Sequence, residues 1–272
     1  MKTDYTKLFF LMKKIYFPLT FMVVGEATIF YFTFINQKYI AHFDFLGIKD
    51  TESFINLNLG SIIIFLILST GFLGKYRRNR AKIYFNQGDV YLDMSKFYFW
   101  FAAKMIGYKK MTLVRVPLHL QFELILEPIF TCYITDEHEN SSDEVNIKYL
   151  NKDKNNNKEI NLALSDTYKV KLDELPKSKR DITTIFIENG EKFNGIRTYN
   201  INFVQAIKKH VHKLSKKYKK VNLFAHTNTQ HNKKIIESSF KMGGRSGFEK
   251  VSIYKYLPDS QTFLDKPHKI TL

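Results

Sequence analysis

The chain has 272 residues, with 42 lysines and arginines against 26 aspartates and glutamates, and a formal net charge of +16. This length accommodates one large domain or two modest ones. The charge favours anionic partners such as nucleotides, nucleic acid or an anionic lipid surface, and a lysine-rich solvated surface is the alternative explanation. Cys132 is the only cysteine, so an intramolecular disulfide and a CxxC metal site are excluded.

Two apolar runs near the N-terminus predict a membrane anchor. The first, at about 15–35, has Glu26 as its only charge, and the second, at 54–74, has no ionisable side chain. As a helix the second run is about 30 Å long, which is the thickness of the hydrocarbon core of a bilayer. We therefore predict two transmembrane helices within an anchor that spans 1–80.

Charged residues beside these runs predict the orientation of the anchor. Lysines precede the first run, and a dense basic cluster follows the second (Lys75, Arg77, Arg78, Arg80, Lys82). Basic residues concentrate on the cytoplasmic side of a membrane. We predict a bacterial inner-membrane protein with two passes, both termini in the cytoplasm, and a soluble domain at 81–272 that carries nearly all of the net charge.

Glu26 and Asn58 are the polar positions of interest inside the predicted bilayer. An ionisable residue at this depth is costly and points to function or to hydrogen bonding between helices. The alternative is a protonated Glu26 held by Thr20, Thr28 or Asn58 of a neighbouring helix. Since two helices are too few to form a pore, a channel or a membrane-disrupting role requires several copies.

Residues 81–159 are predicted to be mainly β. Short β-rich runs recur between turn residues, and Leu118 to Leu126 alternate strictly between apolar and other residues, which is typical of a half-buried strand. A hairpin is predicted between the runs VNIKYL and INLALS. The aromatic and lysine-rich segment 96–111 is either a core helix or strand pair, or a segment that lies on the membrane surface.

Residues 160–258 are predicted to form an α/β layer. Runs typical of buried strands occur at 160–165, 182–188, 221–226 and 251–257, and amphipathic helices are expected at 201–219 and 230–241. This order implies parallel neighbouring strands joined by right-handed crossovers. The predicted fold class is therefore a two-helix anchor followed by a mixed domain, with a β-rich first half and a Rossmann-like second half.

Polar residues at the ends of three predicted strands form the candidate ligand site. Ligands of open α/β sheets bind outside the carboxyl ends of the strands, near helix N-termini. Helix capping alone is the alternative for each of these loops. The candidate ligand-binding residues are Ser165, Thr167, Asn189, Lys192, Arg197, Thr227, Asn228, Thr229, His231 and Arg245.

Motifs of catalysis are not found in the sequence. It contains no Walker loop, no GxSxG, no HExxH and no spaced Cys/His set. His226 and His231 have no evident nucleophile or paired carboxylate beside them. The acidic stretch around His138 fits no metal-ligand spacing. We therefore expect a binding protein without enzymatic activity, without a metal and without a cofactor.

The C-terminal part resembles a known family of sensors. The stretch VNLFAHTNTQHNKKIIESSF, a glycine stop and VSIYKYL resemble the closing unit of SAVED domains, the ligand sensors of bacterial cyclic-oligonucleotide antiphage systems (CBASS). With two membrane helices, the chain resembles the transmembrane-SAVED effectors of those systems. The resemblance implies a CARF-like domain that binds a cyclic oligonucleotide, oligomerises and then disrupts the inner membrane.

The leading hypothesis is thus a membrane-anchored antiphage effector. Its expected partners are a cyclic oligonucleotide, the lipid bilayer and further copies of itself, and no DNA or RNA duplex is expected. Two alternatives stay open: a membrane component of a conjugation or secretion apparatus that acts as an interaction platform, and a membrane-tethered acetyltransferase of the GNAT type. The sequence GIRTYN is a poor substitute for the pyrophosphate loop that the latter requires.

Overall fold

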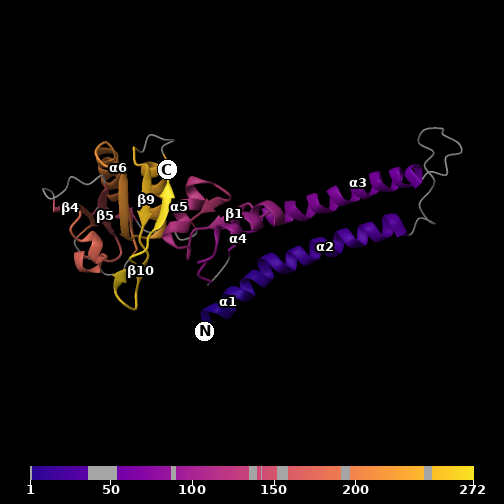
Figure 1. Cartoon of the computed structure of the whole chain (residues 1–272), viewed down its shortest axis with the longest axis horizontal. Coiled ribbons are helices and arrows are strands. Elements are labelled where there is room, and N and C mark those ends of the chain that lie inside the picture. Colours follow the sequence, from indigo (N-terminus) through magenta and orange to yellow (C-terminus); the bar gives the residue numbers. More distant parts are fainter. Residues whose placement is uncertain are drawn as a thin grey trace. The chain divides into compact units, whose positions relative to one another are not determined.

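The computed structural model describes residues 2–35, 54–86, 90–134, 140–141, 143–151, 159–190, 197–241 and 247–272. The chain divides into two compact units (Figure 1). Unit 1 comprises 1–90 and 94–111, and unit 2 comprises 91–93 and 112–272. The units therefore divide near residue 111, whereas the predicted domain boundary lies at residue 80.

Unit 1 begins with a long helix that is continuous from Lys2 to Ile35. It consists of α1 (Lys2–Leu11), the π-helical turn η1 (Met12–Tyr16), α2 (Phe17–Phe30) and a second π-helical turn, η2 (Tyr31–Ile35). Pro18 lacks an N–H group, so it cannot donate to the preceding turn, and η1 ends two residues before it. Within the described residues, Tyr5–Phe34 is the one helix long and apolar enough to cross a membrane.

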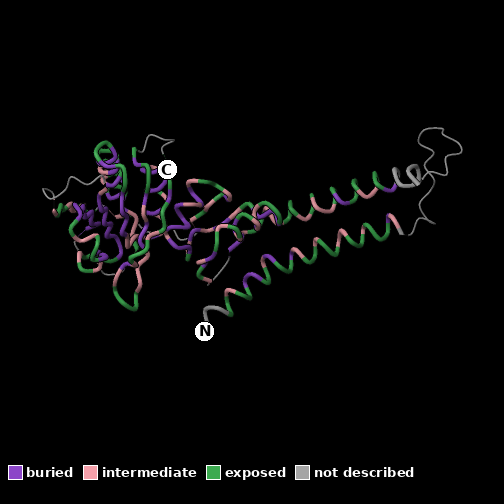
Figure 2. Tube along the Cα trace, viewed as in Figure 1, coloured by how far each residue is buried: buried purple, intermediate pink, exposed green. Residues whose placement is uncertain are grey.

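The second predicted membrane run also forms a helix, α3 (Phe54–Ala81), which continues past the predicted end at residue 74. Figures 1 and 2 show α2 and α3 running side by side, with most of α2 exposed or intermediate. Aromatic pairs join them: the ring of Phe21 lies 5.9 Å from Phe72 and 5.5 Å from Tyr76. Gly25 permits this approach, because a side chain there would collide with the ring of Phe72.

An aromatic core closes unit 1 at the base of these helices. Phe85 is fully buried, and its ring lies 5.3 Å from Phe10, 6.0 Å from Phe99 and 5.5 Å from Tyr108. Phe99 belongs to α4 (Lys96–Phe101), which continues as the π-helical turn η4 (Ala102–Ile106). One face of this segment is buried, as expected of a core helix. Phe97, Trp100 and Met105 are exposed on the other face.

Unit 2 is built on a six-stranded sheet of order β12-β9-β8-β5-β6-β4. The four inner strands are parallel, and the two edge strands, β12 and β4, are antiparallel to their neighbours. The predicted α/β second half is confirmed in this form. The strands of this sheet are β4 (Val145–Leu150), β5 (Glu159–Ser165), β6 (Thr184–Asn189), β8 (Lys220–His226), β9 (Lys250–Ile253) and β12 (His268–Thr271).

The crossovers of this sheet leave on opposite faces. The connection from β5 to β6 contains the 3-10 turns η5 (Leu172–Glu174) and η6 (Lys177–Lys179) and packs on one face. The helices α6 (Ile201–Ser215) and α7 (Thr229–Ile235), with its π-helical extension η7 (Ile236–Phe240), follow β6 and β8 on the other face. The connection from β5 to β6 runs along the sheet in one direction, and the connections from β6 to β8 and from β8 to β9 run in the other. Because crossovers between parallel strands are right-handed, connections that run in opposite directions lie on opposite faces.

Each face of the sheet has its own core. Side chains at 162, 164, 185, 187, 223 and 253 pack beneath α6, α7 and α5 (Leu118–Leu126). Alternate positions at 163, 186, 224 and 254 form a smaller core with Val170, Leu175 and Phe263. The remaining short strands are β1 (Lys110–Thr112), β2 (Thr131–Tyr133), β3 (Asn140–Ser141), β7 (Tyr199–Asn200), β10 (Tyr256–Leu257) and β11 (Thr262–Phe263).

Four predictions about the soluble domain are wrong. Residues 81–159 are not mainly β, because α4, η4 and α5 hold more of the described residues there than the strands β1 to β4 do. Residues 118–126 form α5 rather than a strand: Pro117 precedes the helix and Leu120, Phe122 and Ile125 are all buried. A helix that is buried all round shows no clear period, and Leu, Gln and Glu favour a helix. The β4–β5 hairpin does not form, because β5 pairs with β6 and β8. The strand predicted at 251–257 is two separate strands, β9 and β10.

Candidate ligand-binding site

The candidate site lies at the carboxyl ends of β5, β6 and β8. The connection after β5 crosses one face of the sheet, whereas α6 and α7, which follow β6 and β8, cross the other. Adjacent strands whose connections leave on opposite faces create the crevice in which open α/β sheets bind ligands. The predicted residues at these strand ends therefore occupy the position that the topology favours.

Asp166, directly after β5, is the centre of a buried hydrogen-bond network. Its side chain is 2% exposed. Oδ1 accepts from Asn189 Nδ2 at 2.8 Å, and Oδ2 accepts from the backbone N–H of Asn228 at 3.0 Å. Oδ2 also lies 2.8 Å from Nδ1 of His231. One carboxylate thus joins the ends of three neighbouring strands and the first turn of α7.

The hydrogen bonds of His231 define its tautomer. Its Nε2 accepts from the backbone N–H of Asn200 at 2.8 Å. A nitrogen that accepts carries no proton, so Nδ1 carries the proton and donates it to Asp166. The ring is fully buried and stacks on Tyr199 at 5.2 Å. Because both ring nitrogens are occupied, His231 positions the strand ends and does not present a free base.

Asn200 connects the network to α6. Its side chain accepts from the N–H of Asn202 at 2.9 Å and caps the helix. Its Nδ2 donates to Asn189 Oδ1 at 2.7 Å and to the carbonyl of Asp143 at 2.8 Å. The amide of Asn189 therefore donates to one partner and accepts from the other. Such a network is rigid when every member is satisfied.

A cluster of rings lies around His226, the last residue of β8. The ring of Tyr256 is 4.3 Å away, Phe263 is 5.3 Å away and Tyr168 is 6.4 Å away. Burial lowers the pKa of His226, and Glu174, whose carboxylate is 3.6 Å from Nε2, opposes this shift. Tyr168 is 60% exposed. This cluster offers flat surfaces beside the closed Asp166 network, and flat rings are suited to stacking with nucleobases.

Three of the ten predicted residues, Asn189, Asn228 and His231, meet in the Asp166 network. Ser165 instead accepts from the N–H of Val170, and Thr167 donates to the carbonyl of His226. The remaining predicted residues are placed as follows: Thr227 donates to Asn232, Thr229 begins α7, Arg197 is exposed, and Lys192 and Arg245 lie outside the described residues.

Several residues of this region were not among the predicted ligand-binding residues. Asp166 lies within the polar loop after β5, so its position was a usable signal. Asn200 shows the ordinary pattern of a helix cap, which conceals its second role. Tyr168 and Tyr256 are aromatic residues in loops or at a short strand, and only the tertiary structure places their rings beside His226.

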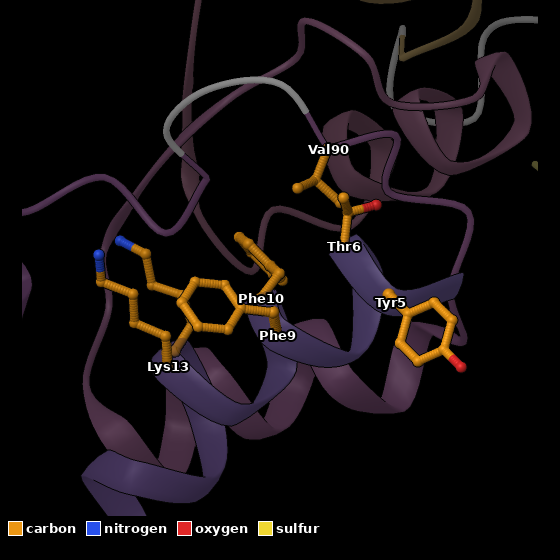
Figure 3. Close-up of a pocket in the computed structure, with 7 residues that line it drawn as sticks. Tyr5, Thr6, Phe9, Phe10, Lys13 and Val90 are labelled. Carbon is orange, nitrogen blue, oxygen red and sulfur yellow. The ribbon is translucent and has the colours of Figure 1, made fainter. Parts of the chain in front are cut away.

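Unit 1 contains a separate cavity beside α1 (Figure 3). It has a volume of about 460 Å³, and Tyr5, Phe9, Phe10, Lys13 and Val90 are among the residues that line it. Nearby, Nζ of Lys14, which also lines the cavity, donates to the carbonyl of Tyr84 at 3.2 Å. Of the two predicted membrane positions, Glu26 is half-buried, with an Oε1 that lacks a hydrogen-bond partner among the described residues. The side chain of Asn58 lies outside the described residues.

Comparison with known families assigns the chain. Residues 2–271 match SUa-2TM, described as the SMODS- and ubiquitin system-associated 2TM effector domain. The chain belongs to the SUa-2TM family. The match covers both units, and the prediction of an effector with transmembrane segments is confirmed at this level. No curated protein matches the SUa-2TM chain.

Among solved structures, the SUa-2TM chain is similar to the Cap4 SAVED/CARF-domain containing receptor of Acinetobacter baumannii. The complexes of that receptor with the cyclic trinucleotides 3'3'3'-cAAA and 2'3'3'-cAAA each give a TM-score of 0.47 at 10% identity. They cover 79% of this chain, which spans 62% and 61% of theirs, about three fifths of the receptor's length. The structure of Cap4 without a named ligand gives 0.40. A likeness of this degree does not by itself assign a fold or a ligand.

Proposed function

We propose that this SUa-2TM protein is a membrane-anchored antiphage effector that binds a cyclic oligonucleotide in unit 2. Binding then drives oligomerisation, and the clustered helices disrupt the inner membrane. The observation that carries the proposal is the family match, which spans residues 2–271 and so includes both the apolar helices and the sheet. The helices α2 and α3 form the two-pass anchor, with both termini in the cytoplasm.

The carboxyl edge of the sheet supplies groups that suit such a ligand. Tyr168 and Tyr256 offer rings for base stacking beside His226. Lys169, whose side chain is 45% exposed and pairs with Glu188 at 3.2 Å, and the exposed Arg197 offer positive charge to phosphates. The Asp166 network holds these strand ends in place without using the ligand to complete its hydrogen bonds.

The same geometry supports binding without turnover. His231 has the carboxylate partner of a catalytic dyad, but its Nε2 accepts a backbone N–H instead of facing a nucleophile. Oligomerisation is supported by the anchor, where Phe21, Val23 and Val24 are exposed on α2 beside Glu26. Oε1 of Glu26 is buried without a hydrogen-bond partner among the described residues, and within a bilayer this favours an association that repacks the helices and supplies a partner.

Titration calorimetry with the full-length protein in nanodiscs tests the ligand. The probes are cyclic di-, tri- and tetranucleotides, including the two triadenylates held by Cap4. Tyr168→Ala removes an exposed ring, and we expect about tenfold weaker binding from the loss of one stacking surface. Tyr149→Ala, which removes a tyrosine that is 40% exposed on β4, is the matched control and leaves the affinity unchanged. Absence of binding by every cyclic nucleotide would refute the proposed function.

A dye-release experiment tests the membrane step separately. Vesicles with the reconstituted protein are expected to release dye only after the cyclic nucleotide is added, and chemical crosslinking then shows species larger than the unliganded protein. Glu26→Leu keeps ligand binding and lowers release. Leakage that does not depend on the ligand would contradict the effector mechanism.

A further inference from the structure

The face of the sheet that carries the smaller core is apolar near the carboxyl ends of the strands and polar near their amino ends. Side chains alternate between the faces of a strand. Positions 163, 224 and 254 on this face are apolar or aromatic and belong to the smaller core. Nearer the amino ends, the same face carries two polar rows that run across the paired strands: Glu159, Lys220 and Lys250 in one row, and Asn161, Asn222 and Ser252 in the next.

Polar residues in these positions are unusual for inner parallel strands. Strands of this kind are covered on both faces and normally read as continuous apolar runs. Asn161 is fully buried and Asn222 is 2% exposed. Asn222 Nδ2 donates to Asn161 Oδ1 at 3.0 Å, and Asn161 Nδ2 donates to the carbonyl of Lys179 at 2.7 Å. The two hydrogen-bonded amides therefore lie between the smaller core and the charged row of Glu159, Lys220 and Lys250, and they form the polar floor of this part of the face.

A cavity of about 330 Å³ lies over this floor. Four lysines and two carboxylates line it, which leaves a net charge of +2. Lys179 pairs with Glu159 at 3.0 Å. Lys220, Lys250 and Lys269 are exposed, and within the described part of the chain none of the three forms an ion pair. All three side chains line the same cavity, so their positive charges can act together on an anion bound there.

Tyr254 adds a neutral donor to the same cavity. Its ring is held by Phe224, with the centroids 4.4 Å apart. Burial, together with the nearby charges of Glu159 and Asp265, raises the pKa of Tyr254 to about 12. The hydroxyl therefore stays protonated at neutral pH, and it forms no hydrogen bond with a described residue. Phosphate oxygens are acceptors that such a hydroxyl can satisfy.

We propose that this cavity is a binding site for a small molecule that carries two or more phosphate charges. Its volume lies at the lower end of the range of small-molecule pockets, which excludes a macromolecule from its interior. The site is distinct from the carboxyl edge, because a seven-residue strand such as β5 separates the two ends by about 20 Å. The inference goes beyond the proposed function and does not depend on the cyclic oligonucleotide.

Calorimetry with pyrophosphate and ATP tests the site on the full-length protein in nanodiscs of neutral phosphatidylcholine, without divalent cations. The variant Lys220→Gln/Lys250→Gln/Lys269→Gln removes the unpaired cations, and we expect about tenfold weaker binding or more. The control Lys208→Gln/Lys209→Gln/Lys213→Gln removes the same charge from the exposed face of α6. It is expected to leave the affinity within about twofold of the wild type, because charges beyond a Debye length are screened.

A third variant tests the sign of the effect. Asp265→Asn removes a carboxylate from the lining of the cavity and is expected to tighten pyrophosphate binding severalfold. Failure of the wild type to bind either probe, or equal weakening in both triple variants, would overturn the inference. Loss of cyclic-nucleotide binding in the variant Lys220→Gln/Lys250→Gln/Lys269→Gln would overturn the claim of a second site. A wild type that binds pyrophosphate but no cyclic nucleotide would support this inference and refute only the proposed function.

Discussion

The Asp166 network makes a prediction that can be tested by exchanging two of its residues. Asp166→Asn replaces one acceptor by a donor. If its Nδ2 faces Asn189, two donors meet, and if it faces His231 and Asn228, two bonds are lost. The negative charge is lost in either case. Removing one partner of a buried, charge-assisted set costs about 3 kcal/mol.

The exchange Asp166→Asn/Asn189→Asp is expected to recover at least about half of that loss. In the double variant, the new amide at position 166 would donate to a carboxylate at position 189 and still accept from Asn228 and His231. That carboxylate would also accept from Asn200, so only one hydrogen bond changes direction. Asn189→Asp alone sets two carboxylates at hydrogen-bond distance and is expected to be at least as destabilising as Asp166→Asn.

Hydrogen exchange of the full-length protein measures these effects. The amides of β5 and β8 report the opening free energy of unit 2 without requiring that the membrane helices unfold. Asp173→Asn changes an exposed aspartate in η5 and is the control. Two results would show that the network does not hold the strand ends together. In one, the opening free energy of Asp166→Asn stays within about 0.5 kcal/mol of the wild type. In the other, the double variant Asp166→Asn/Asn189→Asp loses as much opening free energy as the two single variants added together.

Two further predictions concern packing and pH. Gly25→Leu is expected to separate α2 from α3, because the new side chain collides with Phe72. The control Gly71→Leu, at a position where an added Cβ has no atom within 4 Å, is expected to leave the two helices packed. Cysteine crosslinking between the helices measures both effects. Burial lowers the pKa of His119 to about 4, whereas its pKa in the unfolded state is about 6.5. Between these two values the unfolded state binds more protons than the folded state. The stability of unit 2 therefore falls as the pH drops through this window, by about 3 kcal/mol at most. Thermal unfolding between pH 7 and 4 should show a shallower decline for His119→Gln than for the wild type, and an unchanged decline for the exposed His212→Gln.

The sequence was sufficient for the parts of the fold that have a clear period. The helix α6 has its apolar residues on one face, and the runs at β5, β6 and β8 are continuous and buried, so both were recognisable. By contrast, α5 alternates in sequence and is buried on all sides. In a fully buried segment both periods fit, and tertiary packing then decides between strand and helix.

Strand neighbours were harder to predict than strands. The loop between β4 and β5 is short enough for a hairpin, which is the most common connection between consecutive strands. Here β5 already has β6 and β8 as parallel partners, so β4 pairs with the outer side of β6. Its burial decreases along its length, and its side chains include Lys148, as expected of an edge strand.

The candidate site was predictable in position and not in connectivity. Polar residues after each strand indicated the carboxyl edge, and three of them do meet there. The hydrogen bond from the backbone N–H of Asn200 to His231 joins the start of α6 to the first turn of α7. The two residues are 31 positions apart, so no local sequence pattern predicts this contact. At the amino edge the signal was present: the first residues of β5, β8 and β9 are followed by the related triplets INL, VNL and VSI, each with a polar residue in the centre.

These triplets bear on how the two edges divide the chemistry of the sheet. At the carboxyl edge the members of the Asp166 network satisfy one another, so a ligand there gains from surface rings and exposed cations. One of these cations, Lys169, already pairs with the buried Glu188. At the amino edge the amides are also satisfied, but three cations are left without an ion pair among the described residues. Binding at that edge therefore draws on these three exposed cations, and it should depend more steeply on salt than binding at the carboxyl edge. Equal salt dependence for the two ligands would contradict this difference between the two edges.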